Sequence, residues 1–509
     1  MASIHTLLHP QLGAIIGALQ NGVIQYRGLP YAHIPGRFRP PIGLYSLTLQ
    51  ISSLPFDATK WGPIAPQESG AEKMDSKILN APLIEDELKC TNLVVTVPQD
   101  SSKKKLPVIA WFHGGAYKVG SANYGAYDTV NLVRHSAKIG MPVMTVSVNR
   151  RLNSLGTTAF TELGRGVESG NWILKDEREA LLWVQRHISG FVGDDQNVTY
   201  FGELAGSCSG SLHLYSKTRL FDRAILLSGL AGLLPPRPIE DQQIEYLGVC
   251  KKLGIETEEP GERARQFLNA SPKDVAEPAF NVQTVLTSDW DLIPTKDWVR
   301  FENFSPDPEW CKSLLVGSCR DEWAVMALGG GIEKYEKPVV SFRKRLLGIG
   351  IKASDVDELF EAFGYGFRLP AWKFADWNAK KGRNVWLAHM YMRSPFEGVN
   401  QGKAHHAIDI VFSFLNFSEK FPKEGGYREL AENMVSAWIR YAYGQDPWTR
   451  YEAKGEGDGL VKVFDTLEKE REEPQQRLDE EAWNRWKIMQ RIGLDKVWEE
   501  GQALLENTI

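Results

Sequence analysis

The first half of the chain alternates short apolar runs with segments of helical periodicity. Apolar runs predict strands at residues 93–98, 106–112, 144–148, 198–201 and 223–227. Residues 175–188 lie between two of these runs and carry their apolar side chains at helical spacing. Strands that alternate with helices predict an α/β fold with a mainly parallel sheet and helices on both of its faces.

The segments around this core have other patterns. Residues 11–41 alternate apolar stretches with Gly and Pro, which predicts a small antiparallel hairpin. Over 235–400, helical segments rich in Trp and Phe alternate with Pro and charge clusters. We interpret the chain as one domain over 1–509, with 235–400 as a helical region that covers the substrate at the carboxyl edge of the sheet. Amphipathic helices are predicted at 427–444 and around 480–498.

Composition narrows the class of protein. The chain has 509 residues, 43% hydrophobic and 24% charged, and a formal net charge of -5. No basic patch indicates a nucleic-acid partner, and no apolar stretch reaches the ~18–20 residues that span a bilayer. Residues 1–8 lack the pattern of a secretory signal. The five cysteines have irregular spacings without metal-ligand pairs, so we expect free thiols, no metal, no cofactor and a cytoplasmic location.

Two glycine motifs follow apolar runs. In residues 113–117 (HGGAY), Gly114 and Gly115 come directly after a predicted strand. Backbone N–H groups in such a turn can form an oxyanion hole, although a plain Gly-Gly turn has the same sequence. In residues 202–206 (GELAG), the glycines flank a strand-to-helix turn like a nucleophile elbow. The central residue of this motif is Leu204, and the alternative is an ordinary turn.

The order of further motifs resembles the carboxylesterase type B, or cholinesterase-like, family over nearly the whole chain. The matching segments are 28–32 (GLPYA), 37–38, 62–67, 90–95 (CTNLVV), 149–152 (NRRL), 170–176, 180–184, 191–194 (FVGD) and 198–202. This resemblance implies an α/β-hydrolase fold and a Ser-Glu-His triad in that chain order.

The resemblance also assigns residues to the site. The acid matches Glu322, and the base matches His406 rather than His405 because of its spacing to Phe412. The oxyanion donors match the N–H groups of Gly114, Gly115 and Ala205, with Ser228 and Glu203 as supporting polar residues. Leu204 departs from the family because it stands at the position of the nucleophilic serine. Trp323 after the acid, Leu88, and Cys90 without an upstream cysteine are further departures.

Neighbouring residues do not offer a replacement nucleophile. Ser207 lies roughly 4.5 Å further along the predicted helix, out of register with the oxyanion donors, and Cys208 is expected to pack in the core. Loss of a catalytic serine costs about 10⁶ in kcat in another serine hydrolase. Ordinary ester hydrolysis through an acyl-enzyme is therefore not expected of this chain.

Three hypotheses about function follow. The first is an enzyme of specialised metabolism in which His406 and the oxyanion hole catalyse isomerisation, dehydration, lyase or cyclisation chemistry. Its partner would be a small apolar carbonyl compound, with Leu204 as an apolar floor. The second is an inactive pseudoenzyme or binding module whose Glu322 and His406 form only a buried ion pair. The third is a weak esterase in which His406 activates water.

Overall fold

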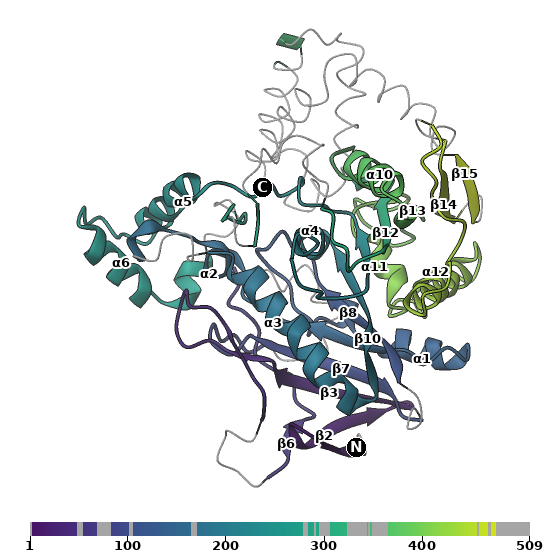
Figure 1. The fold of residues 1–509 in the computed structure, drawn as a ribbon, viewed down its shortest axis with the longest axis horizontal. Helices are drawn as coiled ribbons and strands as arrows, with labels where there is room; N and C mark the ends of the chain where they lie inside the picture. The colour runs from purple at the N-terminus through teal and green to yellow at the C-terminus, as the bar shows by residue number, and fades with distance from the viewer. Residues whose placement is uncertain are drawn as a thin grey trace.

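One large mixed β-sheet forms the centre of the protein (Figure 1). The computed structural model describes residues 3–47, 54–68, 83–100, 105–163, 170–277, 284–289, 292–294, 306–322, 344, 347–348, 365–455, 458–466 and 470–474. Within these residues the sheet has thirteen strands in the order β1-β2-β3-β7-β9-β8-β10-β11-β12-β13-β14-β15, with β6 paired to β2. Seven neighbouring strands from β9 to β14 are parallel, and antiparallel strands flank them on both sides.

The strands have the following bounds: β1 (Ser3–His9), β2 (Gly13–Gln20), β3 (Val23–Pro30), β6 (Phe56–Ala58), β7 (Asn92–Pro98), β8 (Leu106–Phe112), β9 (Met144–Val148), β10 (Gly193–Glu203), β11 (Arg223–Leu227), β12 (Ser313–Cys319), β13 (Asn384–Tyr391), β14 (Leu460–Asp465) and β15 (Arg471–Pro474). Two short strands, β4 (Ala32–His33) and β5 (Ile42–Gly43), form a separate sheet.

The central strands are buried on both faces, because side chains alternate between two hydrophobic cores. In β8, Val108 and Ala110 point into one core, whereas Ile109 and Trp111 point into the other. Successive side chains of a strand face opposite sides of the sheet, so continuous apolar runs are what such a strand requires.

Helices cover both faces. The first core also contains residues of α3 (Trp172–His187) and α10 (Tyr365–Lys380). The second contains residues of α1 (Val130–Lys138), α11 (Ile408–Ser413) and α12 (Tyr427–Ala442). The other described α-helices are α2 (Asn153–Thr157), α4 (Ala205–His213), α5 (Ile239–Lys252), α6 (Pro260–Asn269) and α7 (Pro272–Ala276), and the short 3-10 helices are η2 (Gly125–Tyr127), η3 (Thr161–Leu163) and η5 (Ile188–Phe191).

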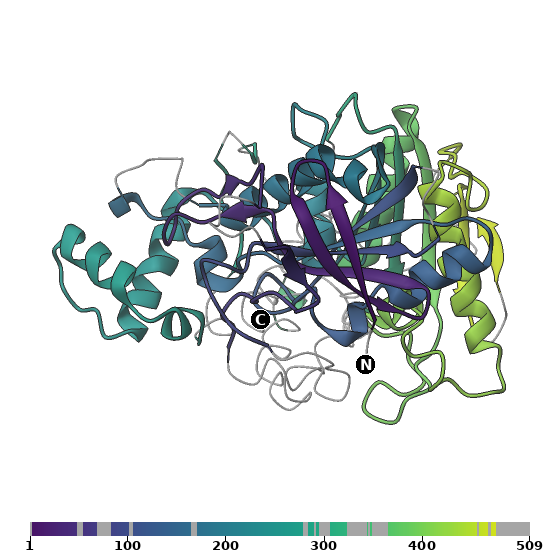
Figure 2. The same cartoon turned by 90° about the horizontal axis from the view of Figure 1, so that it is seen from below.

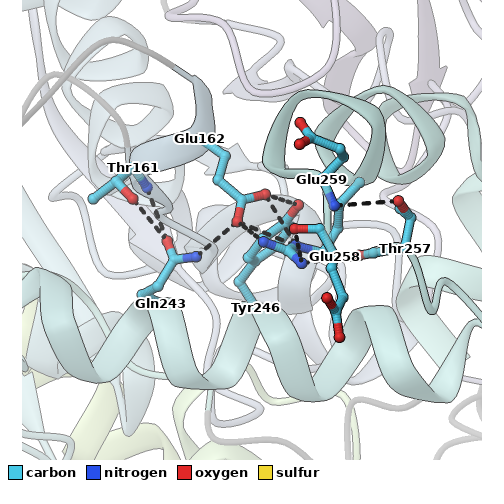
Figure 3. Close-up of polar contacts among 8 residues, drawn as sticks. Thr161, Glu162, Gln243, Tyr246, Thr257, Glu258 and Glu259 are labelled. Atoms are coloured by element: carbon cyan, nitrogen blue, oxygen red, sulfur yellow. Dashed lines mark hydrogen bonds and ion pairs between the residues drawn. The ribbon is translucent and has the colours of Figure 1, made fainter.

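Helices α5 and α6 project away from the sheet in both views (Figures 1 and 2). Figure 3 shows the polar network that joins them to η3 around the carboxylate of Glu162. Tyr246 donates its hydroxyl hydrogen to Glu162 at 2.8 Å, Arg263 forms a salt bridge with the same carboxylate, and Gln243 donates to it at 3.3 Å. A small apolar core that includes Phe160, Tyr246 and Phe267 packs beside this network.

Most predicted elements have the predicted type, and the α/β fold is confirmed. The hairpin within 11–41 is β2 and β3, and the five apolar runs are β7, β8, β9, the end of β10, and β11. The prediction that 235–400 is helical was wrong in part, since β12 and β13 of the central sheet lie inside it. These two runs are short and isolated between loosely patterned segments, so their periodicity did not separate them from helices. The helix predicted around 480–498 lies outside the described residues.

All five cysteines are free, as expected, and all five are buried. Among the helices that the structure describes, none combines the length and the apolar character needed to cross a membrane.

Candidate functional site

The turn between β10 and α4 has the geometry of a nucleophile elbow, with Leu204 at its apex. Leu204 has a φ of 46° and a ψ of -112°, a conformation that non-glycine residues rarely adopt. Side chains at Gly202, Gly206 or Gly229 would overlap backbone atoms of the elbow or of Phe112. Close packing of backbone on backbone therefore holds the turn, and this packing is independent of the side chain at 204.

The loop after β8 places Gly114 and Gly115 beside the elbow. A Cβ on Gly114 would collide with the carboxylate of Glu203 and would lie 3.2 Å from the Cβ of Leu204. Among the described residues, the N–H groups of Gly114 and Gly115 donate to no protein acceptor. Ala205 is the first residue of α4, a position where the N–H has no partner inside the helix. The three expected oxyanion donors thus lie around one elbow.

Glu322 and His406 are brought together by two adjoining loops. Glu322 follows β12, and its Oε1 accepts a hydrogen bond from the N–H of Cys319 at 2.7 Å. A short backbone bridge between Asp321 and His405 holds the loop that precedes α11 against it. Nδ1 of His406 lies 2.6 Å from Oε2 of Glu322. The predicted pairing is present, and His405 instead places its Nδ1 2.6 Å from the carbonyl oxygen of His406.

The other nitrogen of His406 faces a second carboxylate. Nε2 lies 3.3 Å from Oε1 of Glu203, the last residue of β10. Within the described chain this oxygen is buried without a well-aligned hydrogen bond, so the contact is an ion pair by distance only. The ring of Phe367, from α10, lies 5.1 Å from the imidazole ring between their centroids. His406 is therefore enclosed by two carboxylates and an aromatic ring.

Burial and charge shift the titration of this group of residues. Burial by itself would lower the pKa of His406, but the carboxylates of Glu322 and Glu203 outweigh it and raise the pKa to about 9. Burial raises the pKa of Glu203 to about 8, and the neighbouring carboxylates of Asp409 and Glu322 add to this against the opposing effect of His406. His406 is thus an imidazolium at neutral pH, and its Nδ1 lies 2.6 Å from the carboxyl group of Glu322.

Behind the pair lies a third buried carboxyl group that sequence reasoning missed. Asp409 is on α11, and its Oδ1 lies 3.8 Å from the sulfur of Cys319. Burial and the nearby charge of Glu322 raise its pKa to about 7. Ser228, expected near the acid, contacts the sulfur of Cys319 at 3.7 Å, so it reaches Glu322 only through that residue. The acidic residue three positions after His406 was the available signal for Asp409.

The side chains of Ser207 and Cys208 are both buried and donate hydrogen bonds to backbone carbonyl groups. The hydroxyl of Ser207 is fully buried and donates to the carbonyl of Gly229. The thiol of Cys208 donates to the carbonyl of Leu230 at 3.0 Å, and burial raises its pKa. Neither group is placed to act as a nucleophile at the elbow.

The side chain of Leu204 packs against an apolar cluster above the elbow. It is only partly buried there. The cluster contains Tyr117, Ile173, Leu174, Ala205, Cys208, Leu212, Ala231, Leu233, Leu286, Ile293 and Phe367. The surroundings of the elbow apex are therefore apolar on this side, while Glu203 and His406 supply the polar groups.

Comparisons with known proteins identify the family and the fold of the chain. A sequence profile described as the carboxylesterase family matches residues 5–313. Lipase 1 of Yarrowia lipolytica is 33% identical over 479 residues, covering 86% of this chain and 87% of the lipase. The inactive carboxylesterase-like protein VdtD of Byssochlamys spectabilis is 33% identical over 221 residues, 42% of this chain and 36% of that protein. A solved structure of a thermophilic PNB esterase aligns with a TM-score of 0.74 at 23% identity, covering 96% of this chain and 100% of the esterase. The fold is that of an α/β-hydrolase, and the chain belongs to the carboxylesterase family.

Proposed function

We propose that this protein catalyses proton transfer on a small apolar carbonyl compound, in an isomerisation, dehydration, lyase or cyclisation reaction without an acyl-enzyme. The observation that carries the proposal is the contact of 2.6 Å between His406 and Glu322 beside an elbow whose apex is Leu204. The acid–base half of a hydrolase site is in place, and the nucleophile is absent.

Each part of the site has a role in this chemistry. The N–H groups of Gly114, Gly115 and Ala205 would hold the carbonyl oxygen and stabilise the negative charge that develops on it. The imidazolium of His406 acts as the acid, since its pKa of about 9 keeps it protonated at neutral pH. Leu204 and the apolar cluster around it would contact the hydrocarbon part of the substrate.

A second candidate is a protein without catalysis that binds a ligand in the same place. The partial likeness to a relative named as an inactive carboxylesterase-like protein favours it. The third hypothesis, weak esterase activity, has less support, because an imidazolium cannot accept a proton from attacking water.

The first two candidates differ in proton exchange. 2-Tetralone, an apolar ketone with exchangeable hydrogens beside its carbonyl group, is incubated with the protein in D₂O and followed by proton NMR. Catalysis predicts faster deuterium incorporation than in buffer, and its loss in His406→Ala. His405→Ala is the matched control, because that neighbouring imidazole points to a backbone carbonyl rather than to Glu322. Equal exchange with and without protein would favour the binding role for compounds of this class.

A cytoplasmic location is part of the same proposal. It is supported by the five free, buried thiols, which a reducing compartment preserves.

A further inference from the structure

Glu203 occupies a place in the site that the triad by itself does not explain. Its Oε1 lies 3.3 Å from Nε2 of His406, the nitrogen that faces the elbow. The carboxylate also lies so close to Gly114 that a Cβ there would collide with it. One side chain thus touches both the imidazole and the loop that carries the oxyanion donors.

Its surroundings mark Glu203 as more than a buried support. The residue is 3% exposed, and its Oε1 has no aligned hydrogen-bond donor among the described residues. A buried carboxylate that serves the fold is ordinarily satisfied by several donors, as Glu322 is by the N–H of Cys319 and by His406. A polar group left incompletely satisfied beside oxyanion donors is poised to exchange a proton with a bound molecule.

We infer that Glu203 is the base that removes a proton from the substrate, that His406 is its charged partner, and that the substrate is an enolisable carbonyl compound. This inference rests on the proposed function and deepens it. A carbonyl oxygen bound at the N–H groups of Gly114 and Gly115 would place the adjacent carbon near Glu203, because that carboxylate lies against Gly114.

The chemical step balances without a co-reactant. The carboxylate of Glu203 takes the hydrogen from the carbon next to the carbonyl, and the electron pair of that C–H bond becomes a carbon–carbon double bond. The carbonyl π electrons move to oxygen, where the N–H groups hold the negative charge. The proton then returns from Glu203 to the same carbon or to a conjugated one, which gives an epimer or a double-bond isomer.

The titration of the neighbouring groups is compatible with this step. The charged and titratable groups that act on Glu203 are His406 from the loop before α11, Asp409 from α11, and Glu322 from the loop after β12. Burial raises the pKa of Glu203 to about 8, which brings its ionisation close to neutral pH, and the neighbouring carboxyl groups raise the pKa of His406, which favours a charged imidazole. A base with a pKa near the working pH is suited to proton transfer.

The first test compares two isosteric substitutions of buried carboxyl groups, Glu203→Gln and Asp409→Asn. With 2-tetralone in D₂O, we expect Glu203→Gln to lose about 10²-fold or more of the catalysed exchange, the usual contribution of a general base. We expect Asp409→Asn to retain the maximal exchange rate within about threefold, with the pH profile shifted to lower pH, because Asp409 lies behind the pair against Cys319 and acts on Glu203 through its charge. Exchange by Glu203→Gln at the wild-type rate would overturn the inference.

A second measurement needs no turnover. Infrared difference spectra between about pH 6 and about pH 10 should show a carboxylic acid C=O band that disappears on ionisation. The band assigned to Glu203 is expected to be missing in Glu203→Gln and present in Asp409→Asn. If the wild type does not exchange 2-tetralone, the proposed function fails for this substrate class, while this band still supports Glu203 as the proton-carrying group. Spectra in which Glu203→Gln removes no such band would overturn the inference.

Discussion

The elbow between β10 and α4 and the loops that carry Glu322 and His406 are held by different forces. At the elbow, Gly202 and Gly206 permit backbone segments to pack so closely that no side chain fits between them. At the loops, the buried imidazole of His406 lies 2.6 Å from a carboxyl oxygen of Glu322 and 3.3 Å from one of Glu203. The first arrangement is steric and the second electrostatic.

This difference explains how the site keeps its shape with leucine at the apex. The φ of 46° at Leu204 is held by close packing of the surrounding backbone, which depends on the glycines around the turn and not on a hydroxyl at position 204. The acid–base pair has no such independence, because removing one buried charge leaves the other without compensation. At the elbow, the nucleophile can therefore be lost while the turn keeps its shape. At the histidine, loss of either charged group disturbs both the structure and the acid–base chemistry.

The largest expected effect comes from restoring the nucleophile. If the elbow and the Glu322–His406 pair are aligned for catalysis, Leu204→Ser should hydrolyse p-nitrophenyl acetate about 10²-fold faster than the parent protein. This gain is far below the ~10⁶ that the catalytic serine contributes in an evolved serine hydrolase. The smaller side chain opens a cavity that costs about 2–5 kcal/mol of stability. Stopped-flow or steady-state absorbance measures the rate.

The control for this variant is His406→Ala in the Leu204→Ser background, which should remove the gain. A folded Leu204→Ser protein that binds ester without cleaving it would show that the two halves are out of register. High esterase activity in the parent would show that another residue or a water molecule serves as nucleophile.

The backbone packing at the elbow can be disrupted by a substitution that changes no charged residue. In Gly206→Ala the new methyl group collides with the carbonyl of Phe112, so we expect a loss of about 3 kcal/mol in the free energy of unfolding. Urea denaturation measures this loss. The matched control is Gly248→Ala in α5, where the added atom meets nothing within 4 Å. There a gain of roughly 0.5–1 kcal/mol is expected from the better helix former. Equal effects at the two positions would contradict the steric account of the elbow.

The raised pKa values of His406 and Glu203 predict that the stability of the protein depends on pH. His406 keeps its proton up to a pKa of about 9 in the folded protein, compared with a usual value of 6.5. Between these values the folded state binds more protons than the unfolded state, so the free energy of unfolding falls as the pH rises, by roughly 3 kcal/mol. Glu203, with its pKa raised from 4.5 to about 8, acts in the same direction from lower pH.

Chemical denaturation at several pH values between about 6 and about 9 measures this slope. Glu203→Gln should flatten the part below about pH 8, because it removes one of the protons lost in that range. A stability that rises over the whole interval would show that His406 is neutral in the folded protein.

The smallest effect is expected in the outlying helices. Tyr246→Phe removes the hydrogen bond to Glu162 in the network of Figure 3 and should cost about 1–2 kcal/mol. The pH slope and any exchange activity should stay unchanged, because this network lies among η3, α5 and α6 and, within the described part of the chain, has no hydrogen bond to Glu203, Glu322 or His406. Thermal unfolding and the 2-tetralone assay test both statements. A change in exchange rate would show that these helices also control the site.

The sequence by itself determined the central strands, the two glycine motifs and the candidate pair. Continuous apolar runs identified β7, β8, β9 and β11, because strands buried on both faces admit few polar residues. The motif order assigned His406 and Glu322, and their separation of 2.6 Å agrees with that assignment. These features are local in sequence or tied to fixed motifs, so a pattern is enough to find them.

Only the tertiary structure decided what surrounds the histidine. Strands β12 and β13 were hidden in a region predicted as helical, and the place of β12 in the sheet, parallel to β10 and separated from it by β11, brings Glu322 to the edge of the sheet where β10 ends. The contact of Glu203 with Nε2, the ring of Phe367 over the imidazole and the buried carboxyl group of Asp409 join segments far apart in the chain. Periodicity reports which face of an element is buried, but the partner of a buried charge, and hence its pKa, is set by how distant elements pack.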